Sequence, residues 1–294
     1  MAKPGVHRYT AYLFVLPFLL PFAVFSLWPL LYNVWLSLMD YFLAERITAW
    51  NGLANYVTLS ESEWFAQGLK NSLLFLLVVP LMQAAALALA LLVQQKLRGI
   101  SFFRAVYYLP VIIAVSIAGV VWRYVFHYEG MLNGVLSFTG LWPGAAVDWL
   151  GEPKVALYAT MLFSLWKNVG YYMVLYLAGL QAVPRALIDA AHLDGAGPWQ
   201  RLRHVTLPTL RPVILLCTLL STIGALKAFQ EILVLTGGRS DTITLLMFVY
   251  SAAFRGQSFG VAAAAAVVMM VVCFVIAAAQ FRLFGQKGIW GREV

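Results

Sequence analysis

The chain has 294 residues, of which 62% are hydrophobic and only 11% are charged. A soluble domain carries roughly 25% charged residues, so the composition excludes a globule covered by polar surface and predicts an integral membrane protein. In such a protein the formal net charge of +8 indicates basic cytoplasmic loops rather than a nucleic-acid partner. Both cysteines, Cys217 and Cys273, lie inside apolar runs, which argues against a disulfide framework and against a metal site.

Six apolar runs are each long enough to cross a bilayer, since about 20 apolar residues suffice. The first run has no charge from Tyr9 to Met39 and is too long for the apolar part of a secretory signal, about 7–15 residues. We therefore expect an uncleaved first span, bent by its prolines. Leu109-Pro110 should bend the third span, and the short run Ile243–Tyr250 should lie at the interface or fold back. The expected spans are residues 10–39, 70–95, 105–126, 155–183, 210–236 and 256–282.

These runs predict an all-α polytopic membrane protein with six transmembrane helices in a single domain, residues 1–294. Of the 20 Lys and Arg residues, 12 lie in the N-terminal lead, the second–third connection, the fourth–fifth connection and the tail, and six lie in the three opposite loops. Eight of the 12 acidic residues lie in those opposite loops. The positive-inside rule therefore predicts cytoplasmic termini and a cytoplasmic connection at residues 184–209.

The sequence gives little support for catalysis by this chain. All four histidines, His7, His127, His192 and His204, lie outside the spans, and no span pairs a serine with a histidine. No histidine–glutamate cluster has metal-ligand spacing, and no glycine-rich phosphate loop of the Walker type is present. We therefore expect no catalytic residue, no metal site and no ATP site in the chain itself.

Three charged residues, Lys167, Lys227 and Glu231, lie within the predicted spans. A charge at mid-bilayer costs at least ~2.5–3.5 kcal/mol, so such residues face a cavity, a partner helix or each other. Lys227 and Glu231 are spaced i, i+4 and could pair on one helix face. Two interpretations stay open: a polar lining for a solute path or gate, or a purely structural ion pair or subunit contact.

Aromatic and amide side chains surround the first of these lysines, in the stretch Trp166–Tyr172. Rings stack on the apolar faces of sugars, and amides hydrogen-bond with hydroxyl groups, so the stretch favours a sugar path. Ordinary helix packing, with tyrosines at the membrane interface, is the alternative. The residues that we expect along the substrate path are Lys167, Asn168, Tyr171, Tyr172, Lys227, Gln230 and Glu231.

The segment Asp189–Pro208 is a polar, arginine-bearing stretch in an otherwise apolar chain. Pro184 and Pro198 can each begin a short helix, and Gly195 supplies the permissive backbone of a turn between them. The pattern predicts helix, glycine turn and second helix. A small alanine face, and acidic residues on a side where topology favours basic ones, indicate a docking platform for a separate soluble protein. A merely structural connection is the alternative.

This segment resembles the signature loop of the permease subunits of binding-protein-dependent ABC importers. That signature reads EAA, three residues, Gly, nine residues, Ile, any residue, Leu-Pro. Here aspartate replaces the glutamate and valine replaces the isoleucine, at unchanged spacing. The resemblance implies that the segment forms the coupling helices, which sit in a groove on an ATPase subunit. The anchor residues are Asp189, Ala190, Ala191, Gly195, Val205, Leu207 and Pro208.

Other stretches resemble the carbohydrate-uptake branch of that family, in particular the first permease of glycerol-3-phosphate, lactose or multiple-sugar systems. The resemblance implies a type I permease fold in a prokaryotic cytoplasmic (inner) membrane, a second homologous permease, two cytoplasmic ATPases that hold ATP and Mg, and an external solute-binding protein. ATP would close the ATPases, and the spans would switch between inward- and outward-facing states. The stretches are Phe103–Pro110, Ala178–Gln181, Asp194–Ala196, Trp199-Gln200, Leu235–Gly238 and Gly52–Tyr56.

Two other functions stay open on the residues alone. An ion-coupled secondary transporter would use Lys167, Lys227 and Glu231 as coupling groups and would not need a docking segment. A scaffold without transport activity would tolerate disruption of that segment.

Overall fold

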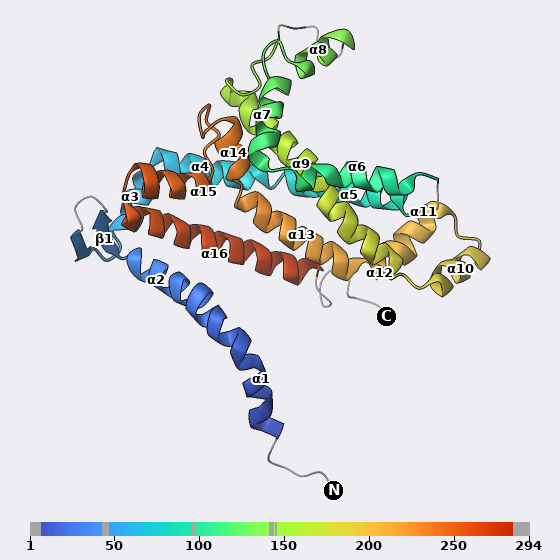
Figure 1. Cartoon of the computed structure of the whole chain (residues 1–294), viewed down its shortest axis with the longest axis horizontal. Coiled ribbons are helices and arrows are strands. Elements are labelled where there is room, and N and C mark those ends of the chain that lie inside the picture. Colours follow the sequence, from blue (N-terminus) through green and yellow to red (C-terminus); the bar gives the residue numbers. More distant parts are fainter. Residues whose placement is uncertain (1–6, 43–46, 96–97, 141–143, 145, 285–294) are drawn as a thin grey trace. The chain divides into compact units, whose positions relative to one another are not determined.

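The computed structural model describes residues 7–42, 47–95, 98–140, 144 and 146–284 (Figure 1). Among these residues the regular secondary structure is helical except for two short paired strands, which confirms the predicted fold class. The chain contacts divide it into two compact units. One unit comprises residues 1–62 and 249–268, and the other comprises residues 63–248 and 269–294.

The first unit begins with a long apolar helix. Helix α1 (His7–Phe22) continues through a π-helical turn (Ala23–Leu27) into α2 (Trp28–Leu36). Proline cannot donate the helical hydrogen bond, and the wider turn follows closely after Pro21, so the prolines alter this helix without ending it. Residues Phe14–Leu36 are long and apolar enough to cross a membrane.

A β-hairpin follows, where the sequence predicted only a polar connection. Strand β1 (Met39–Phe42) pairs antiparallel with β2 (Ile47–Trp50), with Met39 opposite Trp50. The buried Asn55 of α3 (Ala54–Glu61) donates from Nδ2 to the carbonyl oxygens of Ser37 and Met39, both at 2.9 Å. This amide therefore fixes the end of the first helix to the start of the hairpin. A π-helical segment (Ser251–Arg255) also belongs to this unit.

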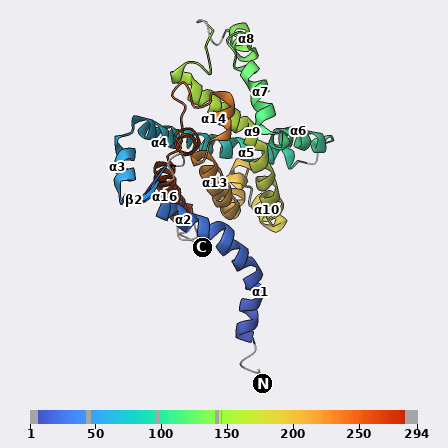
Figure 2. The ribbon, with the colours of Figure 1, turned by 60° about the vertical axis from the view of Figure 1, so that its left-hand side comes forward.

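The second unit is a bundle of helices around α9 (Pro153–Gln181), which packs against α5, α6, α13 and α14 (Figure 2). Helix α16 (Phe259–Phe284) begins in the first unit and ends in the second. The remaining helices are α4 (Glu63–Phe75), α5 (Val78–Val93), α6 (Ile100–Ile112), α7 (Val115–Val125), α8 (Met131–Phe138), α10 (Arg185–Leu193), α11 (Pro198–Arg201), a π-helical turn (Leu202–Thr206), α12 (Leu207–Thr209), α13 (Arg211–Leu226), α14 (Gln230–Leu235) and α15 (Leu245–Tyr250).

Three helices are continuous candidates for membrane spans, namely Phe14–Leu36, Glu63–Val93 and Phe259–Leu283. Three further candidates are helix pairs bent at a short break, so up to six spans are present among the described residues. Helices α6 and α7 meet at 99°, and the bends between α9 and α10 and between the segment Pro198–Thr209 and α13 are both 71°. The third span is thus broken just after Pro110, as its Leu-Pro pair predicted.

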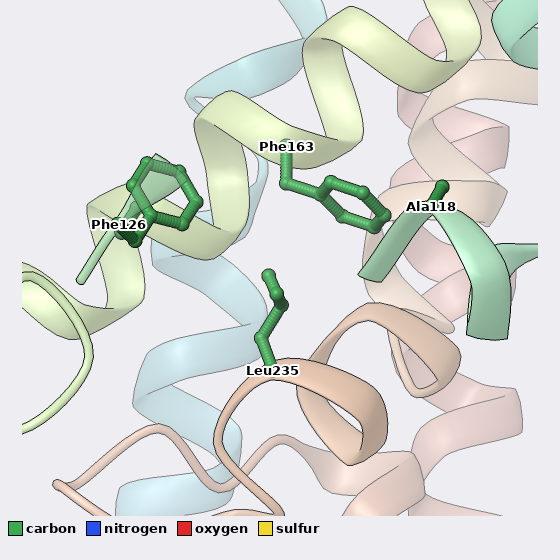
Figure 3. Packing of buried hydrophobic residues seen from close by; sticks show 5 residues of the cluster. Ala118, Phe126, Phe163 and Leu235 are labelled. Atoms are coloured by element: carbon green, nitrogen blue, oxygen red, sulfur yellow. The ribbon is translucent and has the colours of Figure 1, made fainter. Parts of the chain in front are cut away.

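A cluster of buried apolar side chains joins α7, α9 and α14. Figure 3 shows Phe126 and Phe163 on either side of Leu235, with Ala118 beside the Phe163 ring. Because these side chains are almost completely buried, they hold the second half of the broken span against α9.

Candidate functional site

Lys167 lies at the break between α6 and α7. Its side chain is only 6% exposed, and Nζ donates to the carbonyl oxygens of Pro110 at 2.8 Å and Ile113 at 2.7 Å. The last carbonyls of a helix have no partner within the helix and carry partial negative charge. The ammonium group therefore satisfies the end of α6 and offsets its own desolvation.

The sequence places a glycine where α9 approaches α6 most closely. A Cβ atom at Gly170 would collide with the carbonyl oxygen of Tyr107. Only a residue without a side chain allows the two backbones to come this close, and the lysine one turn earlier on α9 then reaches the end of α6.

Glu231 lies in the first turn of α14, where the partial positive charge of a helix N-terminus favours a carboxylate. It is half-buried. Its surroundings include main-chain groups of Phe229 and Glu231, the side chain of Ser164 and the charge of Lys167. The acidic group of α14 therefore lies within electrostatic range of the basic group of α9.

The predicted pairing of Lys227 with Glu231 on one helix face is wrong. Helix α13 ends at Leu226 and α14 begins at Gln230, so the two charged residues lie on either side of a break. Lys227 is exposed and caps the end of α13. No proline or glycine stands within residues 227–229 to signal this break in the sequence.

A cavity of about 80 Å³ opens beside Glu231. Its polar wall contains Ser164, Asn168, Tyr172, Ser221 and Glu231, and its apolar wall comes mainly from α5. A buried water needs about 10–15 Å³ of such space, so the cavity has room for a few water molecules rather than for a sugar ring.

The structure brings only some of the predicted path residues together. Asn168, Tyr172 and Glu231 line the cavity, whereas Lys167 points to the end of α6. Three further predicted path residues are exposed and line none of this cavity: Tyr171, Lys227 and Gln230.

The serines and the glutamine of this region were not among the predicted path residues. Tyr176 donates to Gln83 Oε1 at 2.7 Å, and Gln83 Nε2 donates to Ser221 Oγ at 2.8 Å. This chain of hydrogen bonds connects α9, α5 and α13. The available signal was the presence of polar residues at mid-span, which are costly in lipid unless they are paired.

The segment Asp189–Pro208 has the predicted helix–turn–helix form. Helix α10 ends in a Schellman motif, in which Ala196 N donates to Ala191 O and Gly195 N donates to His192 O. Gly195 has φ +77°, which is the left-handed conformation that this motif requires. Pro184 caps α10 and Pro198 is the first residue of α11, close to the positions predicted.

Two side-chain contacts hold the second helix of this segment. Gln200 Oε1 accepts from Gly197 N at 2.8 Å, and Arg201 Nη1 lies 3.0 Å from His192 Nδ1 across the turn. Of the predicted signature anchors, three are exposed, namely Asp189, Ala190 and Gly195. The other four are half-buried: Ala191, and Val205, Leu207 and Pro208 just before α13.

Large apolar side chains also lie exposed on this segment, a feature that was not predicted. Leu193 is 88% exposed and Trp199 is 69% exposed. Together with the rigid turn they form what we call the docking surface, made of residues 185–201. An exposed apolar patch rimmed by polar residues is typical of a protein-interaction site.

Several known transport proteins are similar to the chain over nearly its full length. The lactose transport system permease protein LacF of Rhizobium radiobacter is 34% identical over 290 residues, which cover 95% of this chain and 96% of that protein. The trehalose/maltose transport system permease protein MalF of Thermococcus litoralis is 36% identical over 248 residues, covering 81% and 82%. The sn-glycerol-3-phosphate permease UgpA of Yersinia enterocolitica is 31% identical over 293 residues, covering 97% and 98%.

A solved structure supports the same fold. A chain of a bacterial ABC transporter involved in the import of the acidic polysaccharide alginate superimposes with a TM-score of 0.77 at 25% identity, covering 92% of this chain and 93% of that one. Residues 59–287 also match the family model described as the binding-protein-dependent transport system inner membrane component. The chain therefore belongs to the family of inner-membrane permease components of binding-protein-dependent ABC transport systems.

Proposed function

We propose that the chain forms half of the translocation path of an ATP-driven importer for a sugar or a sugar-like solute. The observation that best supports this proposal is the rigid, exposed docking surface. It comes directly after α9, the central helix of the bundle, in the chain. The sugar class is supported by the relatives named for lactose and for trehalose and maltose. The relatedness to binding-protein-dependent systems does not favour an ion-coupled transporter.

The partners follow from the same proposal. Two separate ATPase subunits supply ATP hydrolysis, and a second homologous permease completes the path. An external solute-binding protein delivers the solute, in line with a similar alginate transporter whose structure contains an alginate-bound periplasmic protein. The excess of Lys and Arg in the connections on the side of residues 184–209 supports cytoplasmic termini and a cytoplasmic docking surface.

The docking surface acts as the coupling element in this proposal. Leu193 and Trp199 enter the groove of an ATPase subunit, while Asp189 and Asp194 offer carboxylates to its rim. Closure of the ATPases on ATP moves the docking surface, and the Schellman turn transmits the movement because it is held in one conformation. The remaining signature anchors connect the surface to α13.

The cavity beside Glu231 is the part of the solute path that this chain contributes. Asn168, Tyr172 and Glu231 offer hydrogen-bond partners there. Lys167, Tyr171, Lys227 and Gln230 stay in the proposal as residues that contact the solute when the path opens. At about 80 Å³ the cavity corresponds to a closed state of the path.

Replacing Gly195 with valine tests the coupling. A non-glycine residue in the left-handed conformation costs about 1–2 kcal/mol, and a β-branched side chain is the least suited to it. A Cβ atom at this position meets nothing within 4 Å in the chain, so the change strains the turn and leaves the packing intact. We expect Gly195→Val to abolish ATP-dependent solute uptake by the assembled importer in proteoliposomes, with normal membrane insertion.

The matched control is Gly195→Asn, because asparagine tolerates the left-handed conformation. It should keep most of the uptake. Normal uptake by Gly195→Val would refute the coupling role. Uptake driven by a proton gradient without ATP would instead favour a secondary transporter.

A further inference from the structure

A second cavity, separate from the one beside Glu231, lies at the N-terminal end of α4. It has a volume of about 540 Å³, within the roughly 300–1,000 Å³ typical of small-molecule sites. Trp64 and Gln67 of α4 form one wall, and Arg239 and Asp241 of the loop after α14 face them, with Glu63 at the edge. When each bent helix pair is counted as one span, this cavity lies on the opposite side of the membrane from the docking surface.

The loop wall of this cavity is built rigidly. Thr242 Oγ1 lies 2.6 Å from Thr236 Oγ1 and donates to Arg239 O at 2.6 Å. The buried amide of Asn71 donates to the carbonyl oxygens of Asp241 and Ile243. These bonds use the main chain of Arg239 and Asp241, so their side chains are not required to hold the loop.

Two successive residues of this loop have unusual backbone conformations. Ser240 has φ +54° and Asp241 has φ +55°. A non-glycine residue in this region is uncommon and costs about 1–3 kcal/mol, and it persists where the surrounding structure over-determines it. The bonds from Asn71 and Thr242 do so here, and they hold the backbone from which Arg239 and Asp241 project.

The side chains around the cavity combine a ring with hydrogen-bonding groups of both kinds. Trp64 is 69% exposed, so its ring face is open to a ligand. The guanidinium group of Arg239 only donates, and the carboxylates of Glu63 and Asp241 only accept. Gln67 Nε2 donates to Asn71 Oδ1 at 3.2 Å and to Asp241 O at 3.5 Å, so the Gln67 amide offers its oxygen as an acceptor. A saccharide presents an apolar ring face and several hydroxyl groups that donate and accept, so it matches this set.

We propose that this cavity is a binding site for an uncharged saccharide at the outer mouth of the permease. The ring stacks on Trp64, and its hydroxyl groups bind Arg239, Asp241 and Gln67. Two carboxylates against one guanidinium leave the site net negative, which disfavours an acidic sugar. The placement of this cavity on the outer side of the membrane rests on the proposed function. The saccharide-binding site itself goes beyond the proposed function. A protein partner would instead need a broad contact with a hydrophobic centre, and this cavity has one aromatic residue.

The test is saccharide binding to the full-length chain in lipid nanodiscs without the delivery protein, measured by saturation-transfer NMR titration with lactose, maltose and trehalose as probes. We expect at least one probe to bind, and Trp64→Ala to weaken its binding at least about tenfold because the stacking surface is lost. Asp241→Asn should weaken binding about threefold or more, since asparagine keeps the left-handed backbone and loses the charged acceptor.

The matched control is Trp50→Ala, because Trp50 is 68% exposed and does not line the cavity. It should bind the probe like the unchanged chain. Absence of binding for all three probes, or equal loss in both tryptophan variants, would overturn the site. If Trp64→Ala bound the saccharide normally but captured the delivery protein more weakly, the saccharide site would be overturned in favour of a protein contact. ATP-dependent uptake is measured separately, so the proposed function can stand if the saccharide site fails.

Discussion

Replacement of Lys167 by methionine tests whether this lysine, in addition to its proposed contact with the solute, has a structural role. Methionine keeps an unbranched apolar chain and removes the ammonium group that bonds Pro110 O and Ile113 O. A hydrogen bond from a charged group contributes about 1.5–3 kcal/mol, while polar contacts between membrane helices average nearer 0.6 kcal/mol. Taking about 1–2 kcal/mol for each bond, we expect a loss of roughly 2–4 kcal/mol in the free energy of unfolding.

Such a loss should lower the apparent melting temperature of the detergent-solubilised chain by roughly 5–15 °C. The control is Lys227→Met, which removes an exposed lysine and should shift the melting temperature by little, as surface substitutions do. An unchanged melting temperature in Lys167→Met, with a raised KM for uptake, would refute the structural role and leave Lys167 as a solute contact.

The link to Glu231 can be measured by a double-mutant cycle. In the native chain Glu231→Gln removes the electrostatic partner of Lys167. In the Lys167→Met background that partner is already lost, so the same change should cost less, by about 0.5 kcal/mol or more. Strictly additive melting-temperature shifts would show that the two groups do not interact.

Two further predictions concern packing in the second unit. Gly170→Ala should destabilise the chain by about 1–3 kcal/mol, because its Cβ would collide with the Tyr107 carbonyl. The control is Gly224→Ala, whose added Cβ meets nothing within 4 Å. Equal melting temperatures for the two variants would contradict the close approach of α9 to α6. Gln83→Leu should lower the free energy of unfolding by about 1–3 kcal/mol, because it leaves the Tyr176 hydroxyl without its acceptor. Adding Tyr176→Phe to this variant should recover part of that loss in the same thermal assay. No recovery would mean that the hydrogen bond is not the cause.

Much of the fold was predictable from local patterns. Apolar runs predicted an all-helical membrane fold, Pro110 marked the break between α6 and α7, and Gly195 marked the turn of the docking surface. In each case the signal and the structure lie within a few residues of each other. The hairpin of Met39–Phe42 and Ile47–Trp50 was missed because its two strands are only four residues long and sit in a polar stretch.

The candidate site was less predictable because its contacts join distant parts of the chain. Lys167 satisfies a helix end whose carbonyls lie 57 and 54 positions earlier. The break after Leu226 has no local signal, so a helical spacing of four residues wrongly paired Lys227 with Glu231. Periodicity reports which face of a continuous helix a residue occupies, and it fails where the helix stops.

The tie between Lys167 and the end of α6 also has a consequence for how the chain is made. Ribosomes add about 5–20 residues per second, so the lysine is synthesised roughly 3–11 s after Pro110, which lies 57 positions earlier. During that interval the carbonyls at the break in the third span lack their final partner. The bilayer core offers no water to replace it. The carbonyls at the break in the third span therefore gain the lysine only after the fourth span has been synthesised.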